Sequence, residues 1–196
     1  IGILAAIAIP AFIKYLKRSK ASEAPGIVKK VTDGGKSYFE SDQKVTPATN
    51  GEEPWHANTT NAAGDSLPNG YPVPFDSKVF PGGGDLAQVE THASIPRDGT
   101  KATPQDLESI DNTTKQTANK LNLLLVDPTY FLYHYEHNQQ TGPDASMTAV
   151  ACHDFDNSGA STCDTSATDV HAFVATCSWS DQAISCIPGY VINEFL

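Results

Sequence analysis

The sequence lacks the motifs that mark the common catalytic sites. It contains no G-x-S-x-G, H-E-x-x-H or P-loop pattern, and the glycine run at 82–84 belongs to a polar loop rather than to a nucleotide fingerprint. It also contains no internal repeat. These absences disfavour an enzyme, and we expect a chain without catalytic activity.

Basic residues are scarce, and they are unevenly distributed. The chain of 196 residues has 13 Lys and Arg against 23 Asp and Glu. Residues 1–44 hold eight basic and four acidic side chains, so this segment is near +4 and the other 152 residues are near −14. An acidic, polar region of this size fits one domain with one core. It would be repelled by nucleic acid, and no nucleic-acid partner is expected.

Charge is absent from the first thirteen residues, Ile1–Ile13, after which Lys14, Lys17, Arg18 and Lys20 follow closely. Thirteen helical residues span roughly 20 Å, whereas a membrane-spanning helix needs about 20 residues. A signal peptide would carry its basic residues before the apolar core. The segment therefore indicates the end of a longer transmembrane helix, with the basic residues at the membrane edge.

The N-terminal run IGILAAIAIPAF resembles the N-terminal helix of type IV pilins. The resemblance rests on Gly2, the run Leu4–Ile9, Pro10 and Phe12, and it is specific across residues 1–20. From there to residue 44 it is generic. Beyond that it covers the layout of the family, which is a long helix, a connecting loop, an antiparallel sheet and cysteines near the C terminus. In the family further apolar residues precede this point, so we expect the helix to be truncated here.

The resemblance implies a structural subunit of a type IV pilus. Such a subunit waits in the bacterial inner membrane, is polymerised with identical copies by an assembly machinery, and appears in cell-surface filaments for twitching or gliding motility and adhesion. Extracellular polysaccharide or other surfaces are candidate partners of the acidic head. The residues expected in the filament core are Gly2, Ile3, Leu4, Ala5, Ile7, Ile9, Pro10 and Phe12.

Two helix-weakening residues flank the apolar run. Pro10 removes a backbone donor, and Gly2 has low helix propensity. In pili of this family the stretch between such residues loses its helical pairing, which lets the filament extend. The resemblance implies the same for Gly2–Pro10 in the filament.

Two related roles remain open as alternatives. One is a type II secretion pseudopilin, a short piston, although the long head of this chain counts against it. The other is a minor pilin that acts as a surface-binding module on a filament made of another subunit.

The pattern predicts an α+β fold in which a long N-terminal helix packs on an antiparallel sheet. The helix has an apolar part at 1–23 and an amphipathic part at 24–44. We expect a bend near Pro25 and an end near Asp42. Its apolar stripe recurs at helical spacing over Ala24, Ile27, Val28, Val31, Gly35 and Tyr38.

Residues 45–120 are rich in Pro, Gly, Asn and Thr and are expected to form a long irregular loop. One short helix is predicted there, with Thr103 as N-cap, Pro104 at the first position and Asp106 in the first turn. Residues 121–196 are expected to form the sheet. The predicted strands are Leu121–Val126, Thr129–His137, Met147–Cys152, Val170–Cys177 and a short piece at Ile184–Ile187.

Cysteine is absent until position 152, and an even number then follows within the C-terminal region. Outside the cytoplasm such a set forms disulfides, and three pairings are possible. We favour Cys152–Cys163 and Cys177–Cys186, because each closes a short loop between expected strands. The second pair also resembles the C-terminal disulfide loop of the pilins.

The segment DFDNSG at 154–159 fits the start of a calcium-binding loop. Its candidate ligands are Asp154, Asp156 and Ser158, which place oxygen atoms on alternate residues. A polar turn inside a disulfide loop is the alternative, and no other cofactor is expected. A zinc site of cysteines with His153 or His171 is disfavoured, because no C-x-x-C spacing is present.

The segment TYFLYHYEH alternates between two faces of an expected strand. Phe131, Tyr133 and Tyr135 share one face, so they are expected in the sheet core or an interface rather than in a sugar-binding site. His134 and His137 lie on opposite faces, so they cannot share a metal ion. We expect both histidines at the surface or at a sheet edge.

Overall fold

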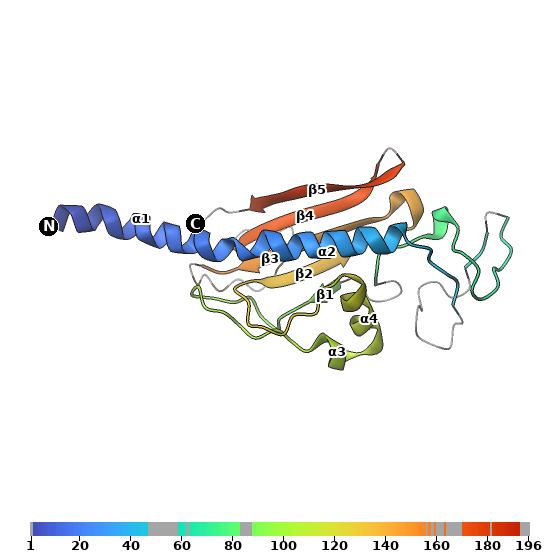
Figure 1. Ribbon diagram of the computed structural model, residues 1–196, viewed down its shortest axis with the longest axis horizontal. Helices are drawn as coiled ribbons and strands as arrows, with labels where there is room; N and C mark the ends of the chain where they lie inside the picture. The colour runs from blue at the N-terminus through green and yellow to red at the C-terminus, as the bar shows by residue number, and fades with distance from the viewer. Residues whose placement is uncertain are drawn as a thin grey trace.

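Two helices in line form the N-terminal part of the chain (Figure 1). The computed structural model describes residues 2–46, 59–61, 63–82, 88–155, 157, 159, 163, 170–180 and 182–192. Helix α1 covers Gly2–Ala21 and helix α2 covers Glu23–Glu40, so only Ser22 separates them. Pro25 has no N–H for the carbonyl of Ala21, which explains an interruption one turn before the proline.

The sheet is an antiparallel meander of five described strands in chain order. Each strand pairs antiparallel with the next strand in the chain, with short connections from β2 to β3 and from β4 to β5, whereas α3 and α4 lie in the long connection from β1 to β2. The described helix and sheet give the expected α+β class. The strands are β1 (Gln88–Glu90), β2 (Leu132–His137), β3 (Ser146–His153), β4 (His171–Ser180) and β5 (Ala183–Ile192).

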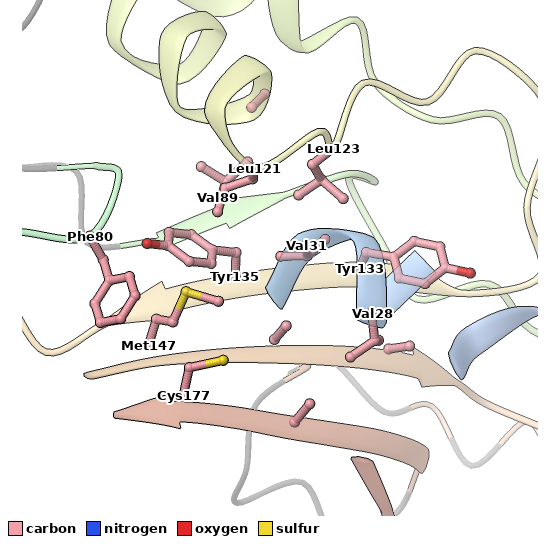
Figure 2. Close-up of a cluster of buried hydrophobic side chains, with 14 of the residues drawn as sticks. Val28, Val31, Phe80, Val89, Leu121, Leu123, Tyr133, Tyr135, Met147 and Cys177 are labelled. Carbon is pink, nitrogen blue, oxygen red and sulfur yellow. The ribbon is translucent and has the colours of Figure 1, made fainter. Parts of the chain in front are cut away.

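Helix α2 lies across one face of this sheet, and the main core lies between them (Figures 1 and 2). The expected stripe from Ala24 to Tyr38 is buried except for Ile27, which is partly buried, and Val28 and Val31 are at most 2% exposed. Opposite it lie Tyr133 and Tyr135 of β2, as the period-two pattern predicted. A second cluster covers the other face of the sheet and includes Leu132, Val150 and Val174.

The predicted strand Leu121–Val126 is wrong, because this segment is an irregular connection that follows a helix. Helix α4 covers Asn112–Lys120 and is preceded by the short helix α3 at Leu107–Ile110. Leu121 and Leu123 are fully buried in the main core just after α4, and this burial accounts for the apolar run without a strand. Short apolar runs of this kind do not distinguish a strand from a buried connection.

The predicted start of the short helix is also wrong. Asp106 is the N-cap of α3, where its side chain accepts from the N–H of Glu108, and Thr103 and Pro104 precede it. Asp111 caps α4 in the same way by accepting from the N–H of Thr114 at 2.9 Å. The region 45–120, which was expected to be an irregular loop, contains α3, α4, strand β1 and the short 3-10 helix η2 (Phe75–Ser77). A second 3-10 helix, η3, covers Gly142–Asp144 between β2 and β3.

Candidate assembly interface

Helix α1 projects beyond the sheet (Figure 1). Its apolar side chains that the structure describes before Ala21 are exposed. Ile7 is 71% exposed and Phe12 is 60% exposed, and Ile9 and Pro10 are exposed as well. The remaining residues of the expected filament core, Gly2, Ile3, Leu4 and Ala5, are helical, and their side chains lie outside the described part of the structure. None of the described helices is long and apolar enough to cross a membrane.

The helix continues through Pro10 without interruption in the single chain. The loss of helical pairing over Gly2–Pro10 was expected for the filament, so it stays a prediction for that state. The four basic residues expected after the apolar run occupy the last two turns of α1, where Lys14 and Arg18 are exposed and Lys17 and Lys20 are half-buried against the head.

Glu23, the first residue of α2, ties the base of α1 to the sheet. Its Oε1 accepts from the N–H of Tyr130 at 3.0 Å and from the hydroxyl of Tyr133 at 3.2 Å. Its Oε2 lies 3.3 Å from the ammonium of Lys101. Burial, and then the adjacent Glu23 carboxylate, raise the pKa of the Tyr133 hydroxyl, so it remains a donor at any physiological pH. Sequence reasoning missed this residue, because a glutamate at a helix start is ordinarily a solvent-exposed charge.

Two lysines near the junction contact the same aromatic ring. Lys20 donates to the carbonyl of Gly99 at 2.8 Å, and its ammonium lies 5.6 Å from the ring centre of Tyr130. Lys101 approaches that ring to 4.8 Å. Lys17 lies 5.8 Å from the ring of Phe155. Cation–π contacts of this type add to the packing at the place where the projecting helix meets the head.

His153 is fully buried beside this junction and is held in its neutral form. Its Nδ1–H donates to the carbonyl of Tyr130, and its Nε2 accepts from the N–H of Gly99 at 3.1 Å. Burial lowers its pKa, and the charge of Lys20 acts in the same direction. Because both ring nitrogens are hydrogen-bonded to the backbone, the ring holds the segment around Gly99 in place. Neither nitrogen is then available as a metal ligand.

The expected calcium ligands are placed only in part. Asp154 is fully buried, its Oδ2 accepts from the N–H of Gly159 at 3.1 Å, and that oxygen lies 3.7 Å from Nε of Arg97. Asp156 and Ser158 lie outside the described residues. Within the part of the chain that is described, no three His, Cys, Asp or Glu side chains form a group that could hold a metal ion.

Both favoured cysteine pairs are disulfides in the structure. Cys152 is joined to Cys163, and Cys177 of β4 is joined to Cys186 directly opposite it on β5. All four sulfur atoms are therefore used in disulfides, and the thiolates that the alternative zinc site requires are not present.

The expectation of surface histidines on β2 is wrong. His134 is 4% exposed, and its ring lies between two carboxylates, with Nδ1 3.2 Å from Glu90 and Nε2 3.5 Å from Glu136. His137 is buried on the other face, where its Nε2 donates to the carbonyl of Gly82 at 2.6 Å. The partner Glu90 comes from β1, a strand of three residues that the sequence pattern did not indicate.

No protein-family model, curated protein or solved structure matches this chain.

Proposed function

We propose that this protein is the structural subunit of a type IV pilus filament and has no catalytic role. The observation that carries the proposal is the exposure of an apolar helix on a head that already has a complete core. Ile7, Ile9 and Phe12 are more than half exposed, whereas the apolar side chains of α2 are buried under the sheet. The resemblance of residues 1–20 to the pilin N-terminal helix supports the same interpretation.

An apolar helix of this kind requires a partner. Apolar surface removed from water contributes about 25 cal/mol per Å². Before assembly the lipid of the bacterial inner membrane would supply this cover. In the filament, identical helices would replace the lipid, and close packing at small residues such as Ala8 would favour this exchange. Because the contact runs from head to tail and does not close, it generates a fibre rather than a ring.

The head would form the outer surface of the fibre. Its two disulfides suit an oxidising compartment, and its acidic composition keeps it in solution. Motility, adhesion and contact with extracellular polysaccharide are the roles that follow for such a fibre in this proposal.

The proposal is tested by producing the protein as the only pilin in a cell that has a pilus assembly machinery. The surface fraction is sheared off, inspected by electron microscopy and identified by mass spectrometry. We expect long filaments made of this chain. The same experiment separates a major subunit from a minor pilin, which acts on a filament made of another subunit.

A variant pair makes the test specific. Phe12→Asp places a charge in the apolar surface of α1 and should abolish the filaments. Tyr71→Asp changes an exposed aromatic residue of the head, 49% exposed, and should leave them. Filaments of normal yield from Phe12→Asp would contradict the proposed role of α1.

A further inference from the structure

Five basic side chains from two distant parts of the sequence surround the place where α1 enters the head. Lys17, Arg18 and Lys20 belong to the last turns of α1, and Arg97 and Lys101 belong to the connection between β1 and α3. We name these five residues the basic collar. The hydrogen bond from Lys20 to the carbonyl of Gly99 joins its two halves, and Lys20 and Lys101 both contact the ring of Tyr130.

The collar has a net positive charge on an acidic protein, because its five basic residues outnumber the acidic residues beside them, Glu23, Asp98 and Asp154. The whole chain has a net charge of −10 and only 13 basic residues, five of which lie here. Two of them have acidic partners, since Lys101 pairs with Glu23 and Arg97 pairs with Asp154. Their side chains nevertheless remain 44% exposed, so they can reach a second anionic group on the outside.

The collar follows the exposed apolar surface of α1 directly. Going along the helix toward the head, apolar Phe12 and Ile13 are followed by Lys14 and Tyr15, which is 67% exposed, and then by the basic residues of the collar. Aromatic and basic residues follow apolar side chains where a helix leaves a bilayer. Arg97 and Lys101 lie at the level of the last basic residues, because the Gly99 between them contacts Lys20.

We propose that the basic collar binds the anionic headgroups of the membrane, so that the head rests on the bilayer through the segment Arg97–Lys101. The inference rests on the proposed membrane stage before assembly, and it adds a lipid-binding surface on the head itself. Each basic residue near an anionic surface strengthens binding about fivefold, and salt screens the effect. Ion pairing with Glu23 and Asp154 reduces the contribution of Arg97 and Lys101 below that limit.

The test measures binding of the full chain to vesicles of neutral phosphatidylcholine and to vesicles that also contain phosphatidylglycerol. The readout is the ratio of the two affinities, because insertion of α1 contributes to both. We expect the ratio to fall about twofold to fivefold in Lys101→Gln and further in Lys101→Gln with Arg97→Gln. The matched control is Lys30→Gln with Lys115→Gln, which removes two exposed positive charges elsewhere and should leave the ratio unchanged.

A second measurement does not depend on removing Arg97, which is the partner of the buried Asp154. An environment-sensitive fluorophore is attached at Thr100→Cys, in the exposed part of the segment, and at Lys115→Cys on α4. A lipid-borne quencher should reduce the emission at position 100 and not at position 115. Equal quenching at the two positions, or an unchanged affinity ratio in the charge variants, overturns the inference.

The acidic head of a neighbouring subunit is the rival partner for the collar. In that case Lys101→Gln would lower the yield of filaments while the vesicle ratio stayed unchanged, and this result would also overturn the inference. The failure of the proposed function looks different, since wild-type protein would then bind vesicles but form no filaments at all.

Discussion

Helices α1 and α2 are parts of one nearly continuous rod, yet they have opposite relations to water. In α2 the apolar side chains form one stripe, and the sheet covers it, so that Phe39 is 1% exposed. In α1 the apolar side chains that the structure describes before Ala21 are exposed, and Phe12 is 60% exposed. One helix therefore completes its packing inside the molecule, and the other requires another molecule.

A hydrophobic stretch does not by itself build the fold. The stretch that is poorer in apolar residues, α2, organises the core because its pattern has a single face toward the sheet. The stretch that is richer in them contributes to the head only through its last turns. Matched variants, first one in each helix and then pairs within α2, test this difference.

The largest expected effect comes from two phenylalanines, one in each helix. Phe39→Ala removes a ring that packs against Phe80 at 4.9 Å and should cost about 3–5 kcal/mol of the free energy of unfolding. Phe12→Ala should change it by less than about 0.5 kcal/mol, because an exposed ring loses little packing. Urea unfolding followed by far-ultraviolet circular dichroism, with both variants in the same detergent solution to cover α1, measures the two changes. Similar losses in the two variants would show that α1 belongs to the core.

Two glycines of α2 differ in how closely the helix packs against the head at their positions. A Cβ at position 34 would lie 2.8 Å from the backbone of Leu121, whereas at position 26 it would meet nothing within 4 Å. Gly34→Ala should therefore destabilise the protein by about 1–3 kcal/mol. Gly26→Ala should stabilise it by about 0.5–1 kcal/mol through helix propensity. Thermal unfolding gives both signs, and a gain in both variants would disprove the close contact.

The junction between the helices is tested at Glu23. Glu23→Ala leaves the N–H of Tyr130 and the hydroxyl of Tyr133 without their acceptor, which should cost about 1–3 kcal/mol. Glu40→Ala removes an exposed carboxylate at the other end of α2, 3.7 Å from Lys36, and should cost less than about 0.5 kcal/mol. Chemical unfolding compares the two, and equal effects would mean that Glu23 does not hold the rod to the sheet.

The smallest expected effect is a pH dependence centred on His134. Burial lowers the pKa of His134, but the hydrogen bond and charge of Glu90, assisted by Glu136, outweigh it and raise the pKa above 6.5. The stabilisation from the charged pair is therefore fully present below about pH 6.5, and it is lost as the pH rises through the higher pKa of the folded protein. Because both carboxylates are more than a third exposed, it should be below about 1 kcal/mol.

The comparison with Glu90→Gln isolates this effect. Burial lowers the pKa of His92 and of His153, so these two residues destabilise the folded state on acidification and act against His134. They contribute equally in both proteins. The difference in the free energy of unfolding between wild type and Glu90→Gln should be larger at pH 5.5 than at pH 8, and a difference that grows with pH would contradict the assignment.

The sequence predicted the helix and the strand whose apolar residues recur at the spacing of one buried face. The stripe from Ala24 to Tyr38 and the alternation of Tyr133 with His134 each indicated the correct element and the correct face. The pattern failed at Leu121 and Leu123, because two buried leucines in a connection give the same apolar run as a strand. The alternation also did not reveal that His134 is buried on the opposite face of β2, and periodicity cannot report what buries a residue.

The candidate interface could likewise be predicted from the sequence only in part. The apolar face of α1 was evident from the absence of charge before Lys14. The contacts at its base were not, because Glu23, Gly99 and Tyr130 are far apart in the sequence and meet only when α2 lies on the sheet. A lone glutamate or glycine carries no local signal for such a long-range contact.

A reconstruction of the purified filament by electron cryomicroscopy tests the central claim most directly. We predict that α1 of every subunit lies at the filament axis with Ile7, Ile9 and Phe12 packed against the α1 helices of other copies, and that the head lies outside. A fibre in which these three side chains face solvent, or in which the heads alone make the contacts between subunits, would contradict it.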